Sequence, residues 1–212
     1  NKEPDPFSHW AGFEIGANGY LSSTGLSLPI GYDFLELNYS KSLNFNLNIL
    51  EKRINLYQDN IQIFSGLGFE FNHYSFDNDI ILSSKTNPIS ATIDTINTYS
   101  KNKLNTTFIT VPLMLGFNSN SNKDRAIHIS AGVVGGYKIG TKYKQKYEFN
   151  NEEFKNKTKA NYNLSPYRLS ARASLGYGNF NIYASYSLTE FFEANKGPKL
   201  HPFSIGIRAL PF

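Results

Sequence analysis

Cysteine is absent from the 212-residue sequence, and methionine and tryptophan occur once each. Without cysteine the chain can form no disulfide, no thiolate metal site, no thiol nucleophile and no lipidated N-terminal cysteine. Only four histidines are present, and their spacing provides no clustered metal ligands. Lysine and arginine form no dense run despite a net charge of +4, which argues against nucleic acid as the main partner. We therefore expect no cofactor, no metal and no nucleic-acid partner.

Long apolar runs are also missing, because no stretch approaches the ~20 residues that a transmembrane helix requires. The chain begins at Asn1 without an initiator methionine or an apolar signal region, which indicates a processed mature fragment. Its mean hydropathy of −0.38 is typical of a soluble protein. A transmembrane β-barrel is the exception, because its lipid-facing apolar residues alternate with polar interior residues and the average stays low.

Aromatic residues are abundant at 15% and charged residues scarce at 18%, so the chain has too much apolar surface to be disordered. Its dominant pattern is alternation of apolar and polar residues, the period of a two-faced β-strand. The clearest example is Leu43 to Ile49, where asparagine occupies every second position. The pattern predicts eight strands, at about residues 11–18, 43–49, 61–71, 106–117, 127–139, 167–177, 180–188 and 203–209.

The predicted connections alternate in length. Long or medium connections span about residues 20–40, 73–103, 142–163 and 191–201, and short ones lie at 58–60, 118–125 and 178–179. An even strand number with short turns at one end and long loops at the other is typical of bacterial outer-membrane barrels. We therefore predict an all-β fold, an eight-stranded antiparallel up-and-down transmembrane β-barrel. Residues 1–212 form one domain, 1–8 are an N-terminal periplasmic segment, and both termini are periplasmic.

A soluble lipocalin-like barrel would show the same alternation with its apolar face turned inward. Aromatic residues near strand ends favour the membrane alternative, because aromatic girdles mark the two membrane interfaces. The residues concerned are Tyr20, Phe71, Phe117, Tyr137, Tyr167, Tyr177 and Phe180. Phe212, an aromatic residue that closes the last strand, is typical of the signal that the outer-membrane assembly machinery reads.

The alternation changes phase after Ile49, where Glu51 and Arg53 occupy positions expected to be apolar. Leu50, Ile54 and Leu56 then lie on the opposite face. Either a β-bulge or a strand end that projects beyond the apolar band accounts for this shift.

Several segments resemble the outer-membrane β-barrel proteins of Bacteroidota, a group that includes the PorT-like barrels of the type IX secretion system. The segments are 9–14, 34–40, 65–71, 111–113, 129–133 and 202–212. The resemblance covers nearly the whole chain and implies the barrel fold and the outer membrane of a Gram-negative cell. Its motifs are barrel-building patterns, so it carries over no catalytic or binding residue.

A polar network is expected inside the barrel. Its charged members are Glu14, Glu70, Lys138, Arg168, Arg172 and Arg208. These residues either line a conducting pore or fill the interior as paired charges, and the narrow lumen of eight strands favours the filled interior. Arginine outnumbers carboxylate in this set, so we expect some of the partners of the arginines to come from loops or water.

Residues 142–163 carry many lysines between aromatic side chains. They are Lys142, Lys144, Lys146, Lys155, Lys157 and Lys159. This segment either contacts anionic lipopolysaccharide or a partner protein, or forms a solvated hairpin beyond the membrane. The other long connection, 73–103, holds more apolar residues than a solvated loop needs, Ile80 to Leu82 and Ile93 among them. They either pack over the barrel mouth or meet a partner.

An enzyme would need serine, histidine and an acid at one rim. The candidates are His9, His73, His128 and His201 with Ser8, Ser75 and Ser130, and no Gly-x-Ser-x-Gly elbow accompanies them. We therefore expect a non-enzymatic subunit of a larger outer-membrane complex, such as a protein secretion (type IX-like) or protein-insertion machine. Its partners would be outer-membrane lipids, lipopolysaccharide and other outer-membrane proteins. The alternatives are a narrow channel for small solutes, a lipid-modifying enzyme and a soluble lipocalin-like carrier.

Overall fold

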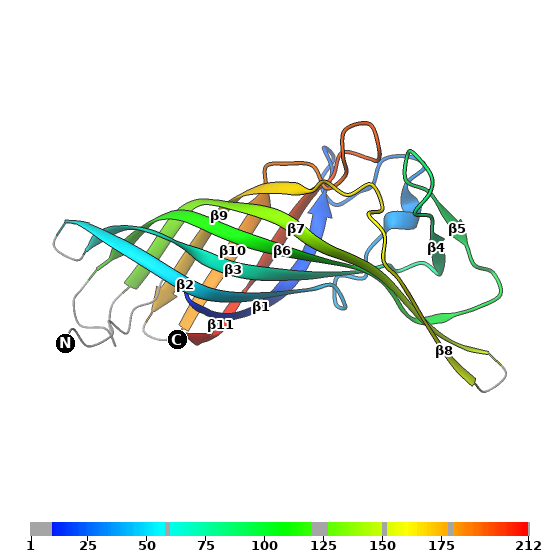
Figure 1. Cartoon of the computed structure of the whole chain (residues 1–212), viewed down its shortest axis with the longest axis horizontal. Coiled ribbons are helices and arrows are strands. Elements are labelled where there is room, and N and C mark those ends of the chain that lie inside the picture. The colour runs from blue at the N-terminus through cyan, green and yellow to red at the C-terminus, as the bar shows by residue number, and fades with distance from the viewer. Residues whose placement is uncertain (1–9, 58–59, 120–126, 150–151, 178–179, 212) are drawn as a thin grey trace.

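Antiparallel strands form most of the chain in the computed structural model, which describes residues 10–57, 60–119, 127–149, 152–177 and 180–211 (Figure 1). The strands are β1 (Gly12–Leu21), β2 (Leu43–Tyr57), β3 (Ile61–Ser75), β4 (Ile80–Leu82), β5 (Ala91–Ile93), β6 (Tyr99–Asn118), β7 (Ile127–Phe149), β8 (Glu152–Thr158), β9 (Tyr167–Tyr177), β10 (Phe180–Ser187) and β11 (His201–Pro211). A short 3₁₀ helix, η1, spans Asp33–Leu35. No helix in these ranges is long and apolar enough to cross a membrane.

Eight of the strands in the described ranges pair in a closed ring. The order is β6-β3-β2-β1-β11-β10-β9-β7, and β7 pairs with β6 to complete it. Every pairing is antiparallel, and β1 and β11, far apart in the sequence, lie side by side. The expected all-β antiparallel class is confirmed, and each of the eight predicted segments falls on a strand of this ring. Three further strands were not predicted, β4 and β5, which form a separate hairpin, and β8, which extends β7.

The ring is polar inside and apolar outside. On β6, Val111, Leu113 and Leu115 are each half-exposed on the outer wall. On the inner wall, Glu14 and Asn44 are fully buried although both are strongly polar. This arrangement is the reverse of a soluble lipocalin-like barrel, in which apolar side chains would face the interior.

A β-bulge explains the phase change in β2. The register with β3 shifts between Asn48 and Leu50, so Ile49 is the extra residue, and β2 continues beyond it to Tyr57. An extra residue turns every following side chain to the opposite face, because alternation has a period of two. A second shift, opposite Thr107 and Phe108 of β6, makes Ile139 the extra residue in β7.

The long connections do not remain simple loops, because they pack together into a hydrophobic core at one end of the ring. We call this core the cap. Its buried members are Tyr20, Leu35, Leu37, Tyr74, Phe76, Ile80, Leu82, Ile89, Leu104, Tyr143, Tyr162, Leu164, Phe191, Phe192 and Leu200. Figure 1 shows β4, β5 and η1 beyond one end of the ring, opposite to the end at which β2 ends and β3 begins. Ile80 and Leu82 thus pack over the mouth of the ring, whereas Ile93 is exposed.

Two expectations for these segments are wrong. Residues 73–103 are expected to form a loop, but they contain β4, β5 and the start of β6. Residues 142–163, by contrast, form the hairpin that was one of their two predicted alternatives, since the end of β7 pairs with β8. Tyr20 was expected at a membrane interface, but it lies in the cap core with an exposed fraction of 2%. Both errors arise because the cap buries apolar residues that carry no strand period. Phe117, Tyr137, Tyr167, Tyr177 and Phe180 are exposed, as an aromatic girdle requires.

Candidate functional site

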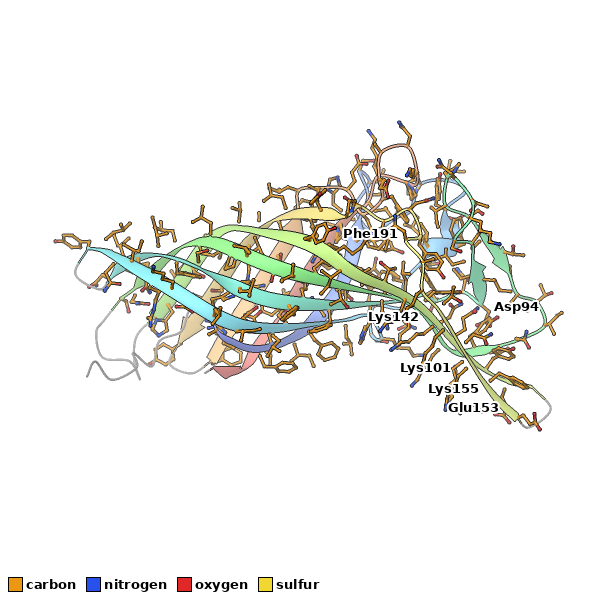
Figure 2. All side chains as sticks on the ribbon, viewed as in Figure 1. Asp94, Lys101, Lys142, Glu153, Lys155 and Phe191 are labelled. Carbon is orange, nitrogen blue, oxygen red and sulfur yellow. The ribbon has the colours of Figure 1, made fainter. Side chains whose placement is uncertain are left out.

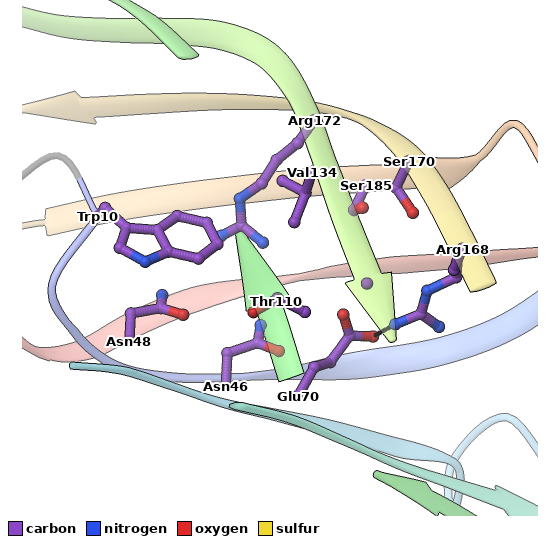
Figure 3. Close-up of a pocket in the computed structure, with 11 residues that line it drawn as sticks. Trp10, Asn46, Asn48, Glu70, Thr110, Val134, Arg168, Ser170, Arg172 and Ser185 are labelled. Carbon is purple, nitrogen blue, oxygen red and sulfur yellow. Dashed lines mark ion pairs between the residues drawn. The ribbon is translucent and has the colours of Figure 1, made fainter. Parts of the chain in front are cut away.

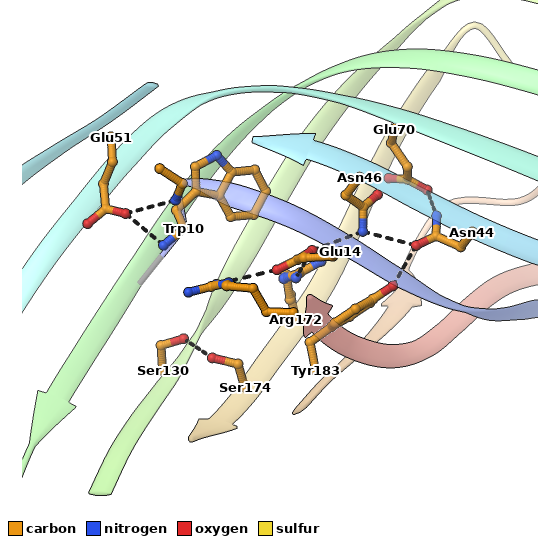
Figure 4. A network of polar contacts seen from close by, with 12 residues as sticks. Trp10, Glu14, Asn44, Asn46, Glu51, Glu70, Ser130, Arg172, Ser174 and Tyr183 are labelled. Atoms are coloured by element: carbon orange, nitrogen blue, oxygen red, sulfur yellow. Dashed lines mark hydrogen bonds and ion pairs between the residues drawn. The ribbon is translucent and has the colours of Figure 1, made fainter. Parts of the chain in front are cut away.

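Glu14 of β1 is the centre of a buried polar network inside the ring (Figure 4). Its Oε2 atom lies 2.6 Å from Nη2 of Arg172, and its Oε1 atom lies 3.3 Å from Nη2 of Arg208. The side-chain amide of Asn46 donates to Oε2 at 3.0 Å. One carboxylate therefore forms ion pairs with two guanidinium groups, which come from β9 and β11.

Glu70 of β3 is the second anion of the network, and its side chain is partly buried. Its Oε1 atom lies 2.5 Å from Nη2 of Arg168 and accepts hydrogen bonds from the amides of Asn72 at 2.8 Å and Asn44 at 3.3 Å. The amide of Asn46 also donates to Oδ1 of Asn44 at 2.9 Å. The alternating asparagines of β2 thus connect the two carboxylates.

Aromatic rings hold the guanidinium groups in place. Arg168 lies over the ring of Phe108 with its Cζ atom 4.0 Å from the ring centroid. Arg172 lies 4.3 Å from the centroid of Tyr183 and 5.2 Å from that of Trp10. Such contacts favour a buried cation because the face of an aromatic ring is electronegative. The hydroxyl of Tyr183 also donates to Oδ1 of Asn44 at 2.7 Å.

A small apolar cluster lies inside the ring beside this network. It comprises Trp10, Phe64, Met114 and Val134. Glu51 fixes the entry of the chain, since its Oε2 atom accepts hydrogen bonds from the backbone N–H groups of Trp10 at 2.7 Å and Ala11 at 3.1 Å. Sequence reasoning missed this cluster. The alternation could have revealed it, because Phe64 and Met114 are apolar residues at positions that the strand period assigns to the interior.

The interior has almost no empty space. A cavity lined by Trp10, Asn46, Glu70, Arg168 and Arg172 has a volume of about 10 Å³ (Figure 3). A site of this size holds about one water molecule. The side chains therefore fill most of the ring where the network lies.

The structure brings together five of the six charged residues expected in the interior. Glu14, Arg172 and Arg208 form one group, and Glu70 and Arg168 form the other. Lys138 does not join them, because its Nζ atom donates to the backbone oxygen of Leu164 at 2.6 Å and to Asn161, at the edge of the cap. Each of the three arginines has a carboxylate partner on the ring itself, but three arginines share two carboxylates, so further partners from loops or water stay a prediction.

The lysines of β7 and β8 within 142–163 lie on the outer face of the sheet, away from this network. Lys144 pairs with Lys103 of β6 on one side and with Lys157 of β8 on the other. Lys146 pairs in the same way with Lys101 and Lys155. Lys142 pairs with Asn105, and Lys159 follows the end of β8. Phe212, the expected assembly signal, and residues 1–8 lie outside the described residues.

Among these lysines, only Lys146 and Lys155, which lie nearest the hairpin tip, form ion pairs with a carboxylate in the ranges described. Glu153 forms ion pairs with Lys146 and with Lys155, the latter at 2.5 Å. Hydrogen bonds from these two lysines lower the pKa of Glu153 from 4.5 to about 2. The hairpin tip is thus close to neutral, and the positive charge is concentrated toward the ring.

Three of the serine and histidine residues considered for catalysis are engaged in other contacts. The hydroxyl of Ser130 lies 2.6 Å from that of Ser174. Nδ1 of His128 lies 2.7 Å from Oδ1 of Asn118, and Nδ1 of His201 lies 3.0 Å from the backbone oxygen of Ser187. Across the described ranges, no three histidine, aspartate or glutamate side chains gather as metal ligands. His9 and Ser8 lie outside these ranges.

Comparison with known proteins identifies one family. The family described as outer membrane protein beta-barrel domain matches residues 3–193. No curated protein and no solved structure matches the chain. The matched range contains most of the ring, the interior network apart from Arg208, and the lysine-bearing hairpin.

Proposed function

We propose, because the chain belongs to the outer membrane protein beta-barrel domain family, that its closed ring is an eight-stranded transmembrane barrel. Family membership implies an outer-membrane location. The cap would then face the cell exterior, and both termini would face the periplasm, since long connections are extracellular and short turns periplasmic in such barrels. The half-exposed apolar side chains of the outer wall are suited to lipid.

The barrel acts, in our proposal, as a non-conducting and non-enzymatic accessory subunit. It would dock onto a larger outer-membrane complex, such as a protein secretion (type IX-like) or protein-insertion machine. The filled interior is the observation that carries this proposal, because it leaves the cap and the outer wall as the surfaces available for function. The resemblance of several segments to PorT-like barrels of Bacteroidota favours a protein secretion machine over a protein-insertion machine as the complex.

The cap offers a contact surface for another outer-membrane protein. Ile93 and Ile96, three residues apart in the chain, are exposed by 69% and 81%. Exposed apolar side chains favour protein contacts, because covering them removes apolar area from water. A partner that rises beyond the membrane would cover these isoleucines.

Planar-bilayer recording tests whether the interior is closed. We expect the purified protein to insert without a steady current, because the cavity beside the polar network has a volume of about 10 Å³ and holds about one water molecule. The variant Arg168→Ala, which removes a large interior side chain, is the informative comparison and should conduct more readily. A steady open current through the unmodified protein would refute the closed interior.

Docking is tested by purification in mild detergent after chemical cross-linking in cells. The double variant Ile93→Asp with Ile96→Asp should lose at least tenfold of the co-purifying outer-membrane protein, because carboxylates cannot be buried at an apolar contact. The control, Ser23→Asp with Ser84→Asp, adds the same charge at exposed positions elsewhere on the cap. Equal recovery with both variants would refute this docking surface.

The non-enzymatic role has its own test. Purified protein incubated with outer-membrane lipids should leave their acyl chains and headgroups unchanged, as judged by mass spectrometry. A change in lipid composition that depends on folded protein would refute this part of the proposal.

A further inference from the structure

The outer side of β6, β7 and β8 carries a surface of lysines just beyond the ring. We call it the lysine face, and its members are Lys101, Lys103, Lys142, Lys144, Lys146, Lys155 and Lys157, with Lys159 at its foot. Residues directly opposite each other on antiparallel strands point to the same side of a sheet. The register therefore places Lys103, Lys144 and Lys157 in one row and Lys101, Lys146 and Lys155 in the next.

Such rows are unfavourable for the protein by itself. Like charges directly opposite each other on neighbouring strands destabilise a sheet. Glu153 compensates the outer row, but in the described ranges no carboxylate forms an ion pair with Lys103, Lys144 or Lys157. An anion bound from outside would remove this repulsion.

The lysine face continues directly from the apolar outer wall. Along one side of β6 the residues change from Leu113 and Val111, which are exposed and apolar, to Lys103 and Lys101. Figure 2 shows Lys142 near the ring, followed outward by Lys101, Lys155 and Glu153. With a rise of about 3.3 Å per residue, Lys103 lies roughly 20 Å along the strand from Ile109. Lys142 is nearer to the apolar wall, since it follows Ile139 by only three residues, or roughly 10 Å, along β7. The inner end of the lysine face therefore adjoins the apolar wall, where headgroups meet acyl chains.

A groove at the foot of this face provides room for a headgroup. Its volume is 810 Å³, and its lining includes Lys142, Lys144 and Lys159 together with Phe71 and Ile139. Charged and apolar side chains thus meet within one groove. This combination suits an amphiphile that carries anionic groups on a bulky polar head.

We propose that the lysine face binds the phosphate groups of a phosphorylated glycolipid in the outer leaflet, a lipopolysaccharide. Lysine binds phosphate as a compact point charge, and several lysines in two rows match a head that carries more than one phosphate. The inference rests on the proposed orientation with the cap outward, because that orientation places the groove in the leaflet that holds the glycolipid. It is independent of which protein the cap contacts.

Binding of purified lipopolysaccharide to the detergent-solubilised protein tests the inference. The triple variant Lys142→Gln, Lys144→Gln, Lys159→Gln removes the lysines of the groove. Each lysine near an anionic surface contributes about fivefold in affinity, so we expect binding roughly 100-fold weaker. The control, Lys41→Gln, Lys85→Gln, Lys199→Gln, removes the same charge from exposed positions elsewhere and should bind like the unmodified protein.

Two further ligands establish what is recognised. The same glycolipid after enzymatic removal of its phosphates should bind the unmodified protein as weakly as intact lipopolysaccharide binds the triple variant. Vesicles containing phosphatidylglycerol should compete at least tenfold less well than lipopolysaccharide. The inference is overturned if the triple variant binds like the control, if dephosphorylated glycolipid binds equally well, or if phosphatidylglycerol competes equally.

Two readouts separate this inference from other causes of lost binding. Thermal unfolding without lipid should be unchanged or shifted upward in the triple variant, because removing like charges relieves repulsion, so a lowered midpoint together with lost binding would contradict the inference. Trypsin applied to intact cells should cut the cap of the unmodified protein. Cleavage only after lysis would show that the proposed orientation has failed, and the inference would fall with it while the closed interior would stand.

Discussion

Glu14 shows how a single side chain can decide the state of a protein interior. Its carboxylate is 1% exposed and lies between Arg172 and Arg208, two guanidinium groups that would otherwise repel each other. Buried charges are costly unless they are paired and hydrogen-bonded. Glu14 meets this condition because Asn46 supplies a further hydrogen bond. The stability of the interior should therefore depend strongly on this one residue.

The variant Glu14→Gln tests this dependence. It keeps the shape of the side chain but leaves two buried cations without their anion, which should lower the free energy of unfolding by about 3–5 kcal/mol. Urea unfolding in lipid vesicles, followed by fluorescence, would measure it. Trp10, the only tryptophan, lies 5.2 Å from Arg172 and reports on this region. The exposed control Glu36→Gln should change little, and equal stability of both variants would contradict the prediction.

For single residues, the sequence predicted which face of its strand a side chain lies on better than it predicted which residues the side chain contacts. Alternation placed Glu14, Glu70 and the three arginines on the interior side, because the period of a strand determines which way each side chain points. It could not reveal that one carboxylate pairs with two arginines, since that depends on how distant strands meet. Lys138 was misassigned for a related reason. It lies near the end of the ring, where a long side chain can reach the cap instead.

At the scale of elements, the hairpin of β7 and β8 is close to neutral at its tip and positively charged at the end that joins the ring. Its aromatic residues lie on the side opposite to the lysines, where the ring of Tyr147 stacks on Phe154 with centroids 5.4 Å apart. The ion pairs of Glu153 join the two strands near the tip. These contacts link the order of the hairpin to the ionisation of one exposed carboxylate.

The pH dependence of this hairpin follows from the pKa of Glu153, which is about 2 in the folded hairpin and 4.5 without its partners. Because folding lowers the pKa, the ion pairs stabilise the hairpin above pH 4.5, and this contribution is lost as the pH falls to about 2. An NMR titration of the Glu153 carboxyl carbon should show a midpoint near 2. In the variant Lys146→Gln, Lys155→Gln the midpoint should return toward 4.5. An unshifted midpoint in the unmodified protein would contradict the ion pairs.

The pairing of β1 with β11 depends on a close approach of two glycines. Gly16 lies opposite Gly206, and a Cβ atom on Gly16 would come within 2.4 Å of the Ile205 oxygen and 2.7 Å of the Tyr183 hydroxyl. The variant Gly16→Val should therefore destabilise the closed ring by about 1–3 kcal/mol or more. The folded fraction can be read from the heat-dependent gel mobility that closed membrane barrels show. Gly135→Ala is the matched control, since its nearest neighbour would lie 3.8 Å away.

Strand positions were predictable from the sequence, and strand ends and the cap were not. The ring strands carry regular alternation over most of their length, as in β9, where exposed and buried residues alternate throughout. Beyond the apolar band, outward-facing residues are no longer apolar, so the alternation stops although the strands continue. β6 and β7 therefore extend further than predicted. β4 and β5 have three residues each, too few to show a period. The bulge at Ile49 was visible as a phase change because both sides of it are strongly patterned.

The whole molecule has two cores of opposite character, a polar one inside the ring and an apolar one in the cap. Tyr74 and Leu104 belong to ring strands but pack in the cap, so the two cores share their boundary. The strongest apolar packing surrounds Phe191, whose ring centroid lies 4.9 Å from that of Tyr74 and 5.0 Å from that of Phe192. We expect the cap to loosen without loss of the ring.

The variant Phe191→Ala tests this separation. Removing a buried phenylalanine should destabilise the cap by about 3–5 kcal/mol. Limited trypsin digestion should then cut the cap at least tenfold faster, while Trp10 fluorescence, which reports on the ring interior, stays unchanged. Ile30, which is fully exposed, supplies the control variant Ile30→Ala. A simultaneous loss of the ring signal would show that the two cores fold as one unit.

The pairing of Gly12 with Pro211 has a consequence for how the protein reaches its membrane. The two strands that complete the ring lie at opposite ends of the described chain, so the hydrogen-bonding edge of β1 has no partner until β11 is available. Sheets that depend on such distant pairings form slowly, and open strand edges invite association with other chains. β11 must therefore be synthesised before closure can begin. A carrier that shields the open edges during transit would decide how much of the chain arrives competent to fold.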